Sequence, residues 1–204
     1  MLNIVSTGDT KNPPLIIAHG LFGSAKNWGM LSRRLSDKWY VIAVDMRNHG
    51  GSGFYPVHNY EAMAEDLQKI VKNHGVDCSM LGHSMGGKAA MFFALEHPEV
   101  VSKLIVVDIA PVKYSHSQSY IIDALRSVKL DFVKSRKDAD VQLASFIDDY
   151  QLRAFLLQSL GLKDGVQWRL NLPVLQKYMA DIVGFPDTKK LFKGKTLLVV
   201  GENS

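Results

Sequence analysis

The chain has 204 residues, 47% of them hydrophobic, so it can bury one core and a single domain is expected. Its 24 Lys and Arg residues barely outnumber its 20 Asp and Glu residues and are scattered, which argues against binding of nucleic acid or a membrane surface. The single cysteine, Cys78, excludes a disulfide framework and a cysteine-based zinc site. Apolar runs fall short of the ~20 residues of a membrane helix, and the first residues lack the pattern of a signal peptide. We therefore expect a cytoplasmic protein.

Short apolar runs rich in β-branched residues alternate with segments of helical spacing. The runs predicted to be strands buried on both faces are residues 15–18, 40–44, 78–81, 104–107 and 197–200. The segments predicted to be helices between them are residues 26–35, 60–73 and 86–97. This alternation predicts an α/β fold with a mostly parallel sheet flanked by helices on both faces. In such sheets ligands bind outside the carboxyl ends of the strands.

The rhythm changes between residues 112 and 190, where no strand pattern is found. The helical pieces expected there are residues 120–133, 141–146, 152–160 and 173–182. The segment follows the strand that ends at Asp108, at the expected ligand edge. We therefore interpret it as a helical cap over the site, with an ordinary surface subdomain as the alternative. The predicted organisation is a core of residues 1–111 and 191–204 and a cap of residues 112–190.

Residues 82–86 read Gly-His-Ser-Met-Gly and lie between a predicted strand and a predicted helix. Gly-x-Ser-x-Gly in this context is typical of a nucleophile elbow, a strained turn that exposes a serine hydroxyl above the sheet. Glycines are needed at positions 82 and 86 because side chains there would collide. Ser84 is therefore the predicted nucleophile. We expect the side chain of His83 to point elsewhere and that of Lys88 to be solvated.

A serine nucleophile creates a tetrahedral oxyanion, which needs amide donors already in place. The elbow supplies the backbone N–H of Met85, directly after the nucleophile. The loop at residues 19–24 follows an early strand and is placed to supply the second donor, for which we predict the amide of Leu21, with Phe22 lining the pocket. His19 is predicted to shape this loop rather than to act as the base.

The predicted acid is Asp108, which ends the strand after the elbow and therefore lies on the adjacent strand end. Its alternative role is a turn cap before Pro111. Glu202 is the fallback acid, since the chain ends Gly-Glu-Asn-Ser where many hydrolases of this architecture carry an Asp. We find no metal-ligand cluster and no phosphate-binding loop, so we expect no metal and no cofactor.

Several of these segments together resemble the YbfF-type esterases of the alpha/beta-hydrolase fold. They are residues 19–24, 45–52, 82–88, 108–112 and the cap segment 168–175. The resemblance implies an alpha/beta-hydrolase fold with a helical cap insertion and a hydrolase of small carboxylic esters or thioesters. It also implies that Asp108 serves the catalytic triad.

The family pattern continues past residue 204 through a helix, a final strand and a loop with the catalytic histidine. This last helix-strand-helix part is missing here, so we expect a chain truncated at its C-terminus. Losing a triad histidine can cost roughly a million-fold in turnover, so the 204 residues alone are expected to be nearly inactive. His116 alone among the seven histidines follows Asp108 and could approach the pocket.

Two other functions remain open. The same triad serves carbon–carbon bond hydrolases, and the same fold serves ligand-binding homologues without turnover. An intact Ser84, both oxyanion elements and Asp108 favour the enzyme. The expected partner is a small-molecule acyl ester, with no nucleic acid and no membrane, and the oligomeric state is left open.

Overall fold

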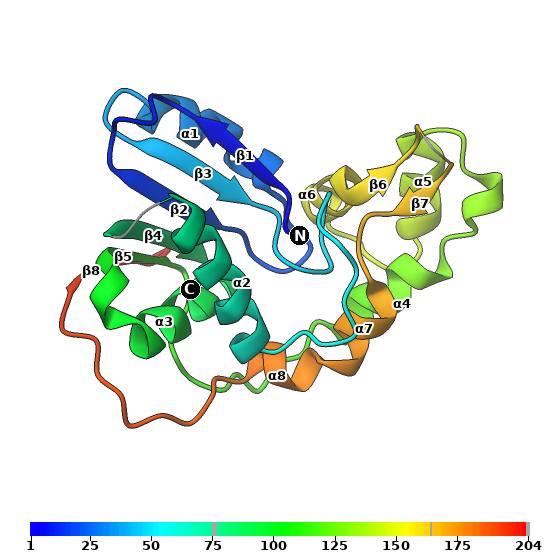
Figure 1. Cartoon of the computed structure of the whole chain (residues 1–204). Helices are drawn as coiled ribbons and strands as arrows, with labels where there is room; N and C mark the ends of the chain where they lie inside the picture. The colour runs from blue at the N-terminus through cyan, green and yellow to red at the C-terminus, as the bar shows by residue number, and fades with distance from the viewer. Residues whose placement is uncertain (75–76, 164, 203–204) are drawn as a thin grey trace.

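The protein is described by a computed structural model that covers residues 1–74, 77–163 and 165–202. Residues 75–76 and 203–204 of the predicted core and residue 164 of the predicted cap lie outside the described residues. The main sheet has the strand order β1-β3-β2-β4-β5-β8 (Figure 1). Its strands are β1 (Ile4–Thr7), β2 (Pro14–Ala18), β3 (Tyr40–Val44), β4 (Cys78–His83), β5 (Val101–Val107) and β8 (Lys195–Val199). Among the strands that the structure describes in this sheet, only the β1–β3 pair is antiparallel, which confirms the mostly parallel arrangement.

Helices cover both faces of the sheet. They are the 3-10 helix η1 (Ala25–Trp28), α1 (Gly29–Leu35), α2 (Tyr60–His74), α3 (Met85–Glu96) and the 3-10 helix η2 (Pro98–Val100). Alternate residues of each strand point to opposite faces. Ile16 and Ile42 therefore enter the larger core that includes the buried side chains of α2 and α3, whereas Leu15 and Val41 face a smaller core with Trp28.

The two edge strands depart from the sequence-based expectations. Strand β1 was not predicted, because its four residues are mostly exposed and too few to show a pattern. Strand β8 forms close to the predicted place, but the expectation that it is buried on both faces is wrong. Leu197 and Leu198 are 56% and 63% exposed, because β8 pairs only with β5 among the described strands and has no covering layer.

Residues 112–190 gather beside the sheet (Figure 1). Their helices are α4 (Ser119–Ser127), η3 (Leu130–Phe132), α5 (Arg136–Leu143), α6 (Tyr150–Leu156), η4 (Leu157–Ser159), α7 (Leu172–Lys177) and α8 (Met179–Val183). The expectation of helices without strands is wrong, since β6 (Leu160–Gly161) pairs with β7 (Gln167–Trp168). Each of these strands has two residues, too short for an alternating pattern. The predicted helix at 141–146 is also misplaced, because α5 begins earlier and ends at Leu143.

Candidate active site

Ser84 sits on a strained turn between β4 and α3. Its backbone has φ 52° and ψ −121°, a conformation that non-glycine residues rarely adopt. Its amide donates to the carbonyl oxygen of Val107 (3.1 Å) on the neighbouring strand, and its carbonyl accepts from the amide of Lys88 (3.0 Å). A Cβ atom on Gly82 would overlap the carbonyl of Gly86, so the turn closes only with glycine at position 82. The serine is half-buried.

Asp108 directly follows β5, and the last residue of β5 pairs with the end of β4 next to the elbow. Its backbone also has a positive φ, 56°, and its amide donates to the carbonyl of Val199 (2.7 Å). Its Oδ1 accepts from the amide of Gly201 (3.3 Å). Burial lowers the pKa of His83, and the nearby Asp108 carboxylate acts in the opposite direction. The charge of Asp108 therefore reaches the elbow. Glu202 lies exposed in the turn after β8.

The predicted oxyanion residues share a cavity with Ser84. The side chains of Leu21 and Met85 line a small cavity together with the serine. Within the described part of the chain, neither backbone amide donates a hydrogen bond. The next amide along the loop is engaged, since Phe22 donates to Nε2 of His49 (3.2 Å). The loop therefore leaves the Leu21 amide available while it holds the following residue.

Three buried histidines, His19, His49 and His58, form a cluster in which the first two rings meet edge-on and the last two are tilted. The ring centroids are 5.1 Å apart for His19 and His49 and 5.5 Å apart for His49 and His58. Burial lowers the pKa of His19 to about 4 and that of His58 to about 3. It holds the pKa of His49 well below its usual value, with the neighbouring imidazoles acting in the same direction. All three rings are neutral at pH 7.

The hydrogen bonds of this histidine cluster fix the loop that carries Leu21. Nε2 of His19 accepts from the amide of Met46 (2.9 Å), so its Nδ1–H donates to the carbonyl of Gly20 (2.7 Å). His49 holds the amide of Phe22 in the same way. His19 therefore shapes the loop, as its position in the sequence predicts. Proton transfer to it is disfavoured, because both ring nitrogens are occupied.

The third histidine of the cluster, His58, contacts the sulfur of Met85 through Nε2 (3.4 Å). Its Nδ1 accepts from the side-chain amide of Asn48 (3.2 Å). The sequence analysis did not single out His58. No local pattern could have done so, because its partner on the elbow lies 27 residues away.

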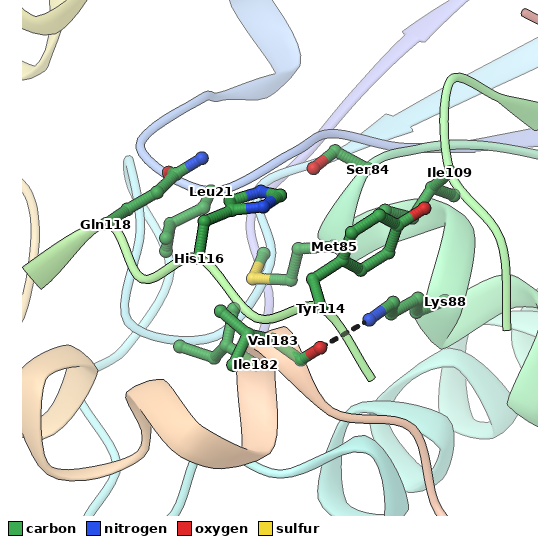
Figure 2. A pocket seen from close by; sticks show the side chains of 10 residues that line it. All are labelled: Leu21, Ser84, Met85, Lys88, Ile109, Tyr114, His116, Gln118, Ile182 and Val183. Atoms are coloured by element: carbon green, nitrogen blue, oxygen red, sulfur yellow. Dashed lines mark hydrogen bonds between the residues drawn. The ribbon is translucent and has the colours of Figure 1, made fainter. Parts of the chain in front are cut away.

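Ser84 lines two cavities. The larger, of about 570 Å³, has mostly apolar walls and includes Phe22. Its walls from η1, α4 and α6 are Trp28, Tyr120, Ile121, Leu152 and Phe155. His83 also lines this cavity, and its ring lies edge-on to Trp28 with 6.5 Å between the ring centroids. The smaller cavity, of about 50 Å³, lies toward α8 and the chain segment after β5 (Figure 2).

His116 lies on the wall of the smaller cavity, edge-on to Tyr114 with 5.3 Å between ring centroids (Figure 2). It does reach the pocket, as its position after Asp108 allowed. Among the residues that the structure describes, however, no histidine is hydrogen-bonded to Ser84. Lys88 lines the same cavity and is only 1% exposed, so the expectation of a solvated lysine is wrong.

Over the described ranges, no group of three or more His, Cys, Asp or Glu side chains is arranged to hold a metal ion. Over the same ranges, no helix combines the length and apolar character needed to cross a membrane.

This elbow on a parallel sheet places the chain in a known class. The alpha/beta hydrolase fold family matches residues 13–192, and the chain belongs to that family. It is 41% identical over 208 aligned positions to the "sn-1-specific diacylglycerol lipase ABHD11" of Mus musculus, covering 97% of this chain and 67% of the relative. It is 39% identical over 176 positions to "Esterase YbfF" of Escherichia coli (strain K12), covering 85% of this chain and 68% of the relative. The chain spans about two thirds of the length of these curated relatives.

A solved structure titled "Marine microorganism esterase" has the same fold. It shares 38% sequence identity with this chain at a TM-score of 0.94, covering 98% of this chain and 80% of that one. The resemblance to YbfF-type esterases and the alpha/beta-hydrolase fold are therefore both confirmed. Relatives named esterase and lipase support carboxylic ester hydrolase activity.

Proposed function

We propose that this chain carries the nucleophile, the acid and the oxyanion donors of a serine hydrolase for small carboxylic esters or thioesters. The supporting observation is the position of Ser84, which is held on a strained turn and lines two cavities. Leu21 and Met85, whose amides are available, line the smaller of these cavities with it. A binding-only pocket needs neither the strain nor the paired amides.

In the proposed reaction, Oγ of Ser84 attacks the carbonyl carbon of the ester and its proton passes to a histidine base. The amides of Leu21 and Met85 donate to the oxyanion. The tetrahedral intermediate then collapses to an acyl-serine, and the alcohol or thiol leaves with the proton from the histidine. Water, deprotonated by the same base, then attacks the acyl carbon, the bond from that carbon to Oγ breaks to release the acid, and the histidine returns its proton to Oγ of Ser84.

All seven histidines of the sequence lie within the described residues, and none is hydrogen-bonded to Ser84. The base in this proposal is therefore a further histidine, in the part of the relatives that these 204 residues do not span. Asp108 would accept a hydrogen bond from that histidine and orient it. Asp108 is exposed, as this role requires. It directly follows β5, whose last residue pairs with the end of β4 next to the elbow.

We also propose that residues 112–190 act as a cap that selects the substrate, on a core of residues 1–111 and 191–204. Tyr120 and Ile121 of α4 and Leu152 and Phe155 of α6 form apolar walls of the larger cavity. Such walls favour an apolar acyl or alcohol group.

For localisation we propose the cytoplasm, where the buried thiol of Cys78 would remain reduced.

The test is hydrolysis of 4-nitrophenyl butyrate by a form of the chain extended with the C-terminal third of a relative. We expect turnover that Ser84→Ala abolishes. Ser32→Ala is the matched control, because it removes a buried hydroxyl on α1 that has no hydrogen-bond partner within the described residues. Full activity of the Ser84 variant would refute the nucleophile. Tight binding of the ester without turnover would instead indicate a ligand-binding homologue.

A further inference from the structure

Lys88 lies on α3, one helical turn after Ser84, and its side chain is buried. Its ammonium donates to three backbone carbonyls, those of Val112 (2.8 Å), Val183 (2.9 Å) and Gly184 (2.6 Å). Figure 2 shows the bond to Val183. An ammonium group has three N–H donors, so each has an acceptor.

The three carbonyls lie near the two ends of the cap segment, residues 112–190. We call residues 110–114 the incoming linker and residues 182–185 the outgoing linker. The linkers also contact each other, because the amide of Tyr114 donates to the carbonyl of Val183 (2.9 Å). The ring of Tyr114 lies 4.7 Å from Nζ of Lys88. Lys88 therefore binds both linkers at the point where they meet.

A second side chain, on helix α2, is hydrogen-bonded to the outgoing linker but, among the described residues, not to the incoming one. The hydroxyl of Tyr60 on α2 donates to the carbonyl of Ile182 (2.6 Å) in the outgoing linker. Removing the Tyr60 hydroxyl would thus weaken the attachment of one linker, whereas removing the Lys88 ammonium would weaken that of both. This difference separates the two anchors experimentally.

A buried charge costs free energy unless hydrogen bonds compensate it. Burial lowers the pKa of Lys88 to about 8, and no carboxylate among the described residues forms a salt bridge with it. An apolar side chain of similar length would fill the space without desolvating a charge, but it could not reach three carbonyls with three donors. The hydrogen bonds to the linkers therefore explain a lysine at this position.

The link to the nucleophile is short. The amide of Lys88 donates to the carbonyl of Ser84, and both side chains line the smaller cavity. Tyr114 and Val183 from the two linkers line the same cavity. We propose that Lys88 is a positioning residue that fastens both cap linkers to the nucleophile helix and so holds the cap walls in place over Ser84. The cap in this inference is the one in the proposed function.

Hydrogen exchange followed by mass spectrometry tests this without any assay of turnover. We expect Lys88→Met to speed exchange in both linkers by about tenfold or more, the effect of losing hydrogen bonds from a charged donor. Strands β2 and β4 should exchange as in the unchanged protein. Lys88→Arg, which keeps charge and donors, should restore most of the protection. Tyr60→Phe should speed exchange in the outgoing linker alone.

Lys72→Met is the matched control, because it removes the same charge from an exposed position on α2. Equal effects of Lys72→Met and Lys88→Met, faster exchange throughout the sheet, or unchanged linkers would each overturn the inference. If Lys88→Met does not fold, Lys88→Gln is measured instead, with the same expected pattern. Failure of the Ser84→Ala test would leave this result standing, so the two proposals fail separately.

Discussion

Ser84 and Asp108 occupy matching positions at the ends of two neighbouring parallel strands. The residues just before them, His83 and Val107, are register partners in the β4–β5 pair. Both Ser84 and Asp108 have a positive φ, 52° and 56°, which costs about 1–3 kcal/mol per residue in such regions. The surrounding structure maintains this strain and thereby presents a hydroxyl and a carboxylate at one edge of the sheet.

The elbow depends on the missing side chain of Gly82. We predict that Gly82→Ala lowers the free energy of unfolding by about 3 kcal/mol or more, because the new Cβ would overlap the carbonyl of Gly86. Urea denaturation measures the change. Gly29→Ala is the control, since nothing lies within 4 Å of its Cβ position and its φ is −57°. That change should stay within about 1 kcal/mol. Equal losses for both variants would contradict the close packing of the elbow.

The acid assignment can be tested by comparing two carboxylates in the extended, active form. Asp108→Asn should lower kcat by about 10⁴-fold, as expected when the orienting carboxylate of a triad is replaced by an amide. Glu202→Gln should lower kcat by less than about tenfold, because Glu202 would not contact the base. The reverse ranking, measured by steady-state ester hydrolysis, would move the acid to Glu202.

His116 provides a separate test of the base. Its ring reaches the wall of the smaller cavity but forms no hydrogen bond with Ser84 in the described part of the chain. We expect His116→Ala to change kcat of the extended form by less than about tenfold, since only packing against Tyr114 is lost. A fall of roughly a million-fold would instead identify His116 as the base.

The features that sequence reasoning predicts well are those with local signals. The Gly-x-Ser-x-Gly pattern around Ser84 and the β-branched runs of β2, β3 and β4 need only neighbouring residues to be read. They predict the parallel sheet, and they lead to the proposal of Ser84 as nucleophile and Asp108 on the next strand end.

The features that it misses depend on distant partners. The ammonium of Lys88 bonds residues 24 and 95 positions away, and no local pattern distinguishes it from a solvated lysine. His58 was missed for the same reason, because its partner Met85 lies 27 residues away in the sequence. The apolar run of β8 looks like a central strand, but whether Leu197 is buried depends on which elements cover the sheet edge.

The cluster of three buried histidines predicts that the folded protein loses stability in acid. Unfolded histidines titrate near pH 6.5, whereas His19 and His58 have pKa values of about 4 and about 3 in the fold and His49 lies well below its usual value. As the pH falls below 6.5, the unfolded chain binds protons that the folded chain does not. Stability should therefore fall by up to about 1.4 kcal/mol per pH unit for each histidine.

Urea denaturation between pH 7 and pH 4.5 measures this slope. His58→Gln removes one of the three titrating rings and should reduce the slope by roughly one proton. Stability that stays constant from pH 7 to pH 5 would show that the rings are not neutral and buried together.

The reactive hydroxyl can be located by peptide mass mapping after the extended form has reacted with a fluorophosphonate. We predict one covalent adduct, on Ser84, and no labelling of the Ser84→Ala variant. An adduct on another serine, or undiminished labelling of that variant, would contradict the assignment of Ser84 as the nucleophile.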